Sequence, residues 1–150
     1  MKKSIPVIAM AMFFLLLIPR ADAASKIGAG IFLGEPQGGL TLRVDRFPVI
    51  GLGWSILNGK NDLRLTVDYW FMEKPIEDSP LFWYWGLGGK IGFHSNLGDG
   101  VVDLGARVPI GLQWFFAEKW EAYVEAAPGI RIFPSVNFWW DAAIGIRYYF

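Results

Sequence analysis

The sequence predicts an all-β fold, an eight-stranded antiparallel up-and-down transmembrane β-barrel. From residue 26 onward, apolar and polar residues alternate in eight runs that are separated by Gly, Pro, Asn and Asp. In the charged runs, the charges fall on one side of the alternation, while Leu, Ile, Val and Trp fall on the other. After residue 23, no stretch is long and apolar enough for a transmembrane helix, so a chain in a membrane must cross it with strands.

The eight runs and their connections define one domain. The predicted strands lie at 26–33, 39–46, 49–57, 62–71, 81–94, 101–115, 120–133 and 137–150. With the amino terminus in the periplasm, the longest connection, 72–80, falls on the periplasmic side, which reverses the usual asymmetry of such barrels. The other connections are short, and this weighs against an adhesin or receptor that recognises partners through long surface loops.

The first 23 residues have the pattern of a secretory signal peptide. Lys2 and Lys3 precede an apolar run at 5–18, and Ala21-Asp22-Ala23 forms a small-x-small cleavage site. The apolar run is shorter than the roughly 20 residues that a spanning helix needs. We therefore predict cleavage after Ala23 and a barrel domain at 24–150, located in a bacterial outer membrane.

The composition excludes several classes of site. The chain has no Cys and a single His, so disulfides, cysteine nucleophiles and histidine-rich metal clusters are absent. Its 14 basic and 14 acidic residues balance, which leaves no electrostatic footprint for nucleic acid. We predict no cofactor and no metal site.

The polar side of the alternation defines the candidate functional residues. In the fourth run, for example, Leu63 and Leu65 alternate with Arg64 and Thr66. The charged residues of this parity form a predicted interior network: Arg43, Asp45, Arg64, Asp68, Lys90, Asp103, Arg107, Glu121, Glu125, Arg131, Asp141 and Arg147. Six are basic and six acidic, so they can neutralise one another inside a barrel.

A soluble β-barrel or sandwich, which hides its apolar face, is the alternative. Two features count against it. The charged parity is also rich in glycine, as at Gly28, Gly30, Gly88 and Gly92, and a narrow lumen needs empty positions beside long Arg side chains. The apolar parity carries bulky aromatic residues toward the strand ends, which is typical of an interfacial girdle. These residues are Trp54, Tyr69, Trp83, Trp85, Trp114, Phe138, Trp140 and Tyr148.

Several motifs resemble those of known barrels. The segment 145–150 resembles the terminal strand of Gram-negative outer-membrane proteins, in which Tyr148 and Phe150 would be the signal for the barrel-assembly machinery. Most of the mature chain is similar to the OmpA/OmpX-like barrel family of unknown function found in spirochaetes and other double-membraned bacteria. The matching segments are 30–36, 53–55, 68–69, 86–91, 107–112, 125–129 and 144–150. The resemblance implies outer-membrane lipid and the assembly machinery as partners, together with an unidentified surface or periplasmic partner, and no established reaction.

Two enzymatic interpretations stay open. His94-Ser95-Asn96 resembles the His-x-Ser-Asn motif of outer-membrane lipid A deacylases, yet adjacent strand residues point to opposite faces, which separates base and nucleophile. The inward acids Glu121, Glu125 and Asp141 could form a glycosidase pair or a cation site. Each has an inward basic residue in the same or a neighbouring run, and we expect Asp141 to lie near Arg131 and Arg147. This pattern favours structural ion pairs and a protein that is not an enzyme.

A pore is the remaining alternative. The interior of an eight-stranded barrel is only just wide enough for its own side chains. Twelve charged side chains would leave at most a narrow path for protons or small ions.

Overall fold

A computed structural model describes residues 27–35, 38–55, 61–96 and 99–150. The predicted signal peptide at 1–23 lies outside these residues. The strands are β1 (Ile27–Glu35), β2 (Gly38–Val44), β3 (Val49–Trp54), β4 (Asn61–Pro75), β5 (Leu81–Asn96), β6 (Asp99–Arg107), β7 (Ile110–Ala117), β8 (Trp120–Phe133) and β9 (Asn137–Tyr149). In the described part of the chain, no helix is long and apolar enough to cross a membrane.

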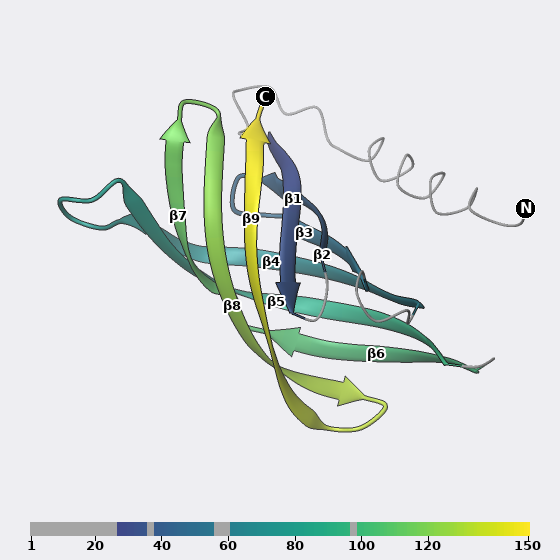
Figure 1. The fold of residues 1–150 in the computed structure, drawn as a ribbon. Coiled ribbons are helices and arrows are strands. Elements are labelled where there is room, and N and C mark those ends of the chain that lie inside the picture. The colour runs from purple at the N-terminus through teal and green to yellow at the C-terminus, as the bar shows by residue number, and fades with distance from the viewer. Residues whose placement is uncertain (1–26, 36–37, 56–60, 97–98) are drawn as a thin grey trace, which may run out of the picture.

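The nine strands occupy eight positions around a closed barrel (Figure 1). Consecutive strands from β1 to β5 pair antiparallel, and the ring closes where β1 pairs with β9, from Gly28↔Tyr149 to Glu35↔Ala142. β6 and β7 share one position, because both pair with β5 on one side and with β8 on the other. The predicted eight-stranded antiparallel barrel is therefore confirmed.

A proline explains why the predicted run 101–115 is divided into two strands. Pro109 has no amide hydrogen, so it cannot donate to a ladder. Its carbonyl accepts a hydrogen bond from the Gly86 amide, and the Val108 amide donates to the Pro128 carbonyl, each at 2.9 Å. The wall thus remains hydrogen-bonded across the interruption.

The predicted loop at 72–80 is wrong, because β4 continues to Pro75 and only Ile76–Pro80 connects it to β5. A bulge at Phe71 shifts the register between the pairs Trp70↔Gly86 and Met72↔Trp85. The shift interrupts the alternation that predicts a strand. Pro75 is tolerated because β3 stops pairing with β4 at Asp68, which leaves an open edge.

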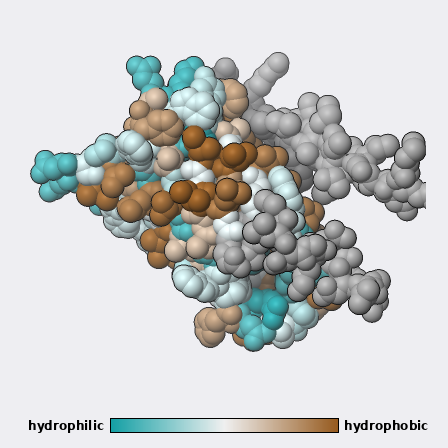
Figure 2. Space-filling view, in the orientation of Figure 1, coloured by the Kyte–Doolittle hydropathy of each residue, from teal (hydrophilic) through white to brown (hydrophobic). Residues whose placement is uncertain are grey.

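The barrel is polar inside and apolar outside. Ile144 on β9 is 62% exposed, whereas Arg147, three residues further on, is 2% exposed. The buried polar side chains are Thr41, Arg43, Arg64, Thr66, Asp68, Arg107, Gln113, Glu121, Asp141 and Arg147. On the face shown in Figure 2, hydrophobic residues gather around the middle of the barrel, and hydrophilic residues mark the tip of the β4–β5 hairpin.

Aromatic side chains line the outer wall at one end of the barrel, which we name the C-terminal end because β9 ends there. These rings form two groups, and within each group neighbouring ring centroids are 5.1 to 6.4 Å apart. One group is Phe47, Tyr69, Phe71 and Trp85, and the other is Trp114, Phe116, Trp120, Tyr148 and Phe150. The opposite end, where β5 and β8 end, is named the mouth.

Candidate functional site: the charged interior

The interior side chains form three layers along the barrel, near the C-terminal end, at the centre and at the mouth. Strand alternation sends every second side chain inward, so each layer draws residues from several strands.

The layer near the C-terminal end is built on Glu121, which is fully buried. Its Oε1 accepts a hydrogen bond from Arg147 Nη1 at 2.8 Å, and its Oε2 lies 3.5 Å from Arg43 Nη1 and accepts a hydrogen bond from the Tyr149 hydroxyl. Arg43 Nη2 also contacts Glu73 Oε2 at 2.7 Å. Two arginines and two glutamates thus neutralise one another in this layer.

Aromatic rings and neutral polar groups fill the space around these charges. Trp70 and Tyr84 stack with ring centroids 3.8 Å apart, and the guanidinium of Arg43 lies 4.3 Å from the Trp70 ring centroid. The Arg147 guanidinium lies 3.9 Å from the Tyr123 ring. In the amide orientation that satisfies both neighbours, Gln113 donates to Glu73 at 2.7 Å and accepts from Arg43 at 3.0 Å. Trp70, Tyr84, Gln113 and Glu121 are fully buried in this layer.

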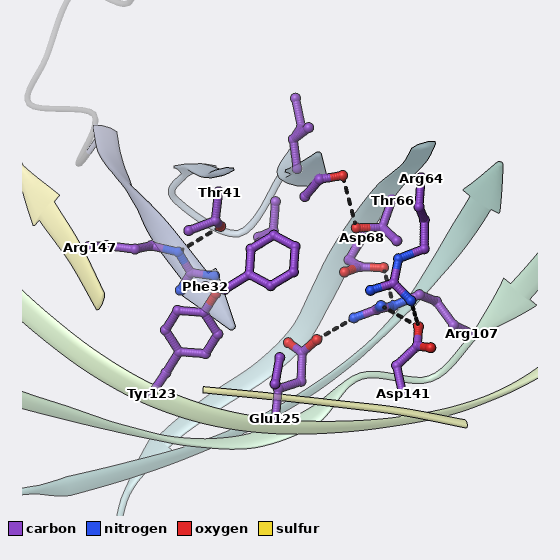
Figure 3. A pocket seen from close by; sticks show the side chains of 14 residues that line it. Phe32, Thr41, Arg64, Thr66, Asp68, Arg107, Tyr123, Glu125, Asp141 and Arg147 are labelled. Atoms are coloured by element: carbon purple, nitrogen blue, oxygen red, sulfur yellow. Dashed lines mark hydrogen bonds and ion pairs between the residues drawn. The ribbon is translucent and has the colours of Figure 1, made fainter. Parts of the chain in front are cut away.

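The central layer is built on Arg107, which lies between three carboxylates (Figure 3). Its Nε lies 3.1 Å from Asp68, its Nη1 lies 3.6 Å from Asp141, and its Nη2 donates to Glu125. A charge-assisted contact with each acid compensates for removing the arginine from water.

Two further cations complete the central layer. Arg64 Nη1 lies 2.7 Å from Asp141 Oδ2, and Lys90 Nζ lies 3.7 Å from Asp141 Oδ1. The Tyr84 hydroxyl donates to Glu125 at 2.7 Å. With Arg107, three cations therefore face three carboxylates, those of Asp68, Glu125 and Asp141.

The mouth layer is built on His94, whose two ring nitrogens both contact carboxylates. Nδ1 lies 3.0 Å from Asp62 on β4, and Nε2 lies 2.6 Å from Asp103 on β6. Arg131 Nη1 lies 3.6 Å from the other oxygen of Asp103. These contacts engage both nitrogens of His94, so the arrangement leaves neither one for Ser95, the residue of the deacylase-like motif.

Glycines provide the room that these side chains need. Gly28 lies opposite Arg43, Gly30 opposite Arg147, and Gly88 opposite both Asp68 and Arg107. A Cβ atom at Gly88 would collide with the Asp68 carboxylate. The predicted placement of glycine beside long charged side chains thus has a steric reason.

The structure brings together all but one of the residues of the predicted network. Each of them except Asp45 contacts at least one opposite charge within 4 Å. The placement of Asp45 in the interior is wrong, because this residue lies exposed in the turn after β2 with a φ of 51°. Asp is among the few residues that adopt this backbone conformation readily. Tyr148, half of the predicted assembly signal, packs outside against Trp120 and Phe150.

The predicted network lacks several interior residues, among them Glu73, Gln113, Asp62 and His94. Glu73 falls in the wrongly predicted loop, and the bulge at Phe71 brings it onto the lumen side, opposite Tyr84. Gln113 lies outside the predicted network because it is uncharged, although it has the same strand parity as Arg107. Asp62 and His94 also share the inward parity of their strands. The alternation that selects Arg64 and Lys90 would have found them.

The chemistry of the interior is that of ion pairing. A cavity of about 30 Å³ lies among Arg64, Asp68, Arg107, Glu125 and Asp141, and a single water molecule needs roughly 10–15 Å³ on the same scale. The acids considered as a glycosidase pair or cation site, Glu121, Glu125 and Asp141, each contact an arginine. In the described residues, no group of three or more His, Asp or Glu side chains is placed to hold a metal ion.

A solved bacterial β-barrel domain supports the fold assignment. The N-terminal β-barrel domain of Pseudomonas aeruginosa OprF is 15% identical and matches with a TM-score of 0.58, over 86% of this chain and 100% of that one. Neisserial surface protein A is 12% identical and matches with a TM-score of 0.45, over 83% of this chain and 95% of that one. Acinetobacter baumannii CarO is also 12% identical, with a TM-score of 0.41 over 83% and 98% of the two chains.

Sequence comparison gives the family. Among curated proteins, none matches the chain. One family model covers the predicted barrel domain and a few residues before it. Since this model matches residues 19–150, the chain belongs to the family described as "Protein of unknown function (DUF3996)".

Proposed function

We propose that this chain is an integral outer-membrane barrel of double-membraned bacteria, spirochaetes among them, with a structural or interaction role and no reaction of its own. Residues 1–23 direct its export and are removed. Its OprF-like fold supports the proposal, and His94, the base of the deacylase-like motif, has both ring nitrogens in contact with carboxylates.

One observation carries the proposal, namely that the polarity of the barrel is inverted. Arg43, Arg64, Arg107 and Arg147 are each at most 5% exposed, whereas large apolar side chains such as Val124 and Ile144 are more than half exposed. A soluble β-protein buries its apolar face instead. An apolar exterior is stable in contact with acyl chains, whereas one Arg or Lys on the lipid-facing side destabilises a barrel by about 2–4 kcal/mol at the bilayer midplane.

The orientation follows from the usual topology of such barrels, with both termini in the periplasm. The C-terminal end then faces the periplasm and the mouth faces the cell exterior. The aromatic groups at the C-terminal end lie at one membrane interface. Outer-membrane lipid, the barrel-assembly machinery acting through the last strand, and an unidentified surface or periplasmic molecule are the proposed partners.

The filled lumen supports a barrel that does not conduct ions. Trp70 and Glu121 are fully buried in the layer near the C-terminal end, and this layer lies across the path from the mouth to the periplasm. We expect planar-bilayer recordings on the purified protein to show no current steps. Regular single-channel steps would favour the narrow pore instead.

Matched substitutions at Val124 test the membrane location. Val124 is 51% exposed in the apolar band of β8. Val124→Arg should lower the free energy of unfolding in lipid vesicles by about 2–4 kcal/mol, while Val124→Ile should leave it unchanged. In a soluble protein, an arginine at this exposed position would be neutral within about 0.5 kcal/mol. Folded wild-type protein should also show heat-modifiable migration on gels, and its recovery from the soluble periplasm would refute the proposal.

A further inference from the structure

The barrel wall is interrupted near the mouth. β6 pairs with β8 only from Leu104 to Arg107, and the register shifts between Leu104 and Gly105. Its pairing with β5, in contrast, continues to Asp99. Among the described residues, β6 therefore has no partner on its β8 side from Asp99 to Asp103. In Figure 1, the β5–β6 hairpin and the β8–β9 hairpin end apart from each other.

A cavity of about 160 Å³ lies at this opening. That is roughly ten times the space that one water molecule needs. Lys90, Asp103, Arg131 and Trp139 line it from the lumen side, and Leu104 and Phe138 line it from the outer side. Phe138 is 87% exposed. The cavity therefore crosses the wall and joins a charged inner part to an apolar outer part.

The acids near the cavity are engaged by other groups. Asp103 contacts His94 at 2.6 Å, and Asp141 contacts Arg64 at 2.7 Å. The two cations that line the cavity have longer ion pairs, 3.7 Å from Lys90 to Asp141 and 3.6 Å from Arg131 to Asp103. The side chains of Lys90 and Arg131 are 17% and 33% exposed, so both can be reached from the cavity.

The two cations of the cavity carry more N–H donors than their close contacts engage. The Lys90 ammonium has three N–H donors and lies 3.7 Å from the Trp139 ring. Arg131 has five N–H donors. In the amide orientation that satisfies its neighbours, Asn137 accepts from Arg131 Nη2 at 2.6 Å, the hydrogen bonds from Arg131 to Ser135 are 3.3 Å each, and Arg131 Nη1 has only the 3.6 Å contact with Asp103. An anionic group with several oxygens, such as a phosphate, would satisfy the remaining donors.

We propose that the opening between β6 and the β8–β9 hairpin binds an amphiphile with an anionic head group, the head lying against Lys90 and Arg131 and the chain leaving along Leu104 and Phe138. The inference rests on the proposed membrane location, because it places the outer side of the opening in lipid. The apolar exit distinguishes this ligand from a free anion.

Native mass spectrometry of the purified protein, released from uncharged detergent, tests the proposal. We expect the protein to retain phosphatidylglycerol in preference to phosphatidylcholine with the same chains. Lys90→Gln and Arg131→Gln should each weaken this retention about tenfold, the loss expected for one charge-assisted contact. Arg46→Gln and Lys119→Gln, which change exposed cations at the other end, should have no effect.

Further measurements distinguish the binding of an amphiphile from the binding of a free anion, and a loss of binding from a loss of folding. Phe138→Asn should weaken retention of phosphatidylglycerol, and inorganic phosphate should not displace it. Equal retention of both lipids, or displacement by inorganic phosphate, would overturn the proposal. Each variant is compared only where it keeps heat-modifiable migration. A folded barrel without lipid preference refutes the site alone, whereas a protein that is soluble without detergent refutes the membrane location as well.

Discussion

Arg43 on β2 and Glu73 on β4 form a 2.7 Å ion pair even though β3 separates their strands in the sheet. The pair forms beyond the end of the β3–β4 ladder at Val49↔Asp68, where the Trp70 amide also donates to the Arg46 carbonyl at 3.0 Å. The bulge at Phe71 makes it possible by turning Glu73 inward.

Removal of the Glu73 charge should therefore weaken the barrel. We expect Glu73→Gln to lower the free energy of unfolding by about 1–3 kcal/mol, because the carboxylate that then remains beside Arg43 is that of Glu121, at the longer distance of 3.5 Å. Urea titration of the protein refolded in lipid vesicles measures the change. Glu77→Gln, which removes an exposed charge in the turn after β4, is the control and should stay within about 0.5 kcal/mol. Equal effects of the two would show that the ion pair adds nothing.

Alternation alone predicts most of the fold and much of the interior. Arg64, Arg107 and Arg147 could be assigned to the lumen because strand parity is preserved on β4 as far as Trp70 and along the β5–β6 and β8–β9 ladders. Glu73 could not, since one extra residue reverses the parity after Trp70 and the sequence does not mark where a bulge lies. The error at Asp45 has a different cause, because the alternation continues by one residue into a turn.

The sequence does not predict which oppositely charged side chain each interior charge contacts. Asp141 was expected near Arg131 and Arg147 on grounds of proximity along the hairpin, yet it contacts Arg64, Lys90 and Arg107. Side chains reach across the lumen, so their contacts depend on how the ring closes. Closure joins β9 to β1, two strands at opposite ends of the sequence.

Substitution of Glu121 should have the larger effect on stability. This carboxylate is fully buried and holds Arg43, Arg147 and Tyr149. Glu121→Gln leaves two buried guanidinium groups with one partner fewer, so we expect a loss of about 3–5 kcal/mol. Glu118→Gln, three residues earlier in the exposed turn, should be neutral in the same urea titration. A loss below 1 kcal/mol would mean that the layer near the C-terminal end does not depend on this charge.

Adjacent glycines on β5 offer a test of the packed lumen. Gly88 faces inward, where an added Cβ collides with Asp68, whereas the Cβ of a residue at 89 would meet only the Gly105 carbonyl oxygen at 4.0 Å. Gly88→Ala should destabilise the barrel by about 1–3 kcal/mol, and Gly89→Ala should cost nothing. Thermal loss of heat-modifiable migration ranks the two variants. If Gly89→Ala were the more harmful substitution, the assignment of inner and outer faces on β5 would be reversed.

Phe150, part of the proposed assembly signal, allows assembly to be separated from stability. Phe150 is 78% exposed, and its ring contacts Tyr148 with centroids 5.5 Å apart. Its side chain therefore contributes little to the folded barrel, and Phe150→Ala should change the free energy of unfolding in vesicles by less than about 1 kcal/mol. If the assembly machinery reads Phe150, as we propose, the same variant should reach the membrane fraction of cells in several-fold lower amounts. Trp140→Ala, which removes an aromatic residue of similar exposure, 74%, elsewhere on β9, should leave these amounts unchanged. If both variants reached the membrane in equally reduced amounts, the cause would be the loss of apolar surface. If Phe150→Ala reached the membrane in the same amount as the wild type, Phe150 would not belong to the assembly signal.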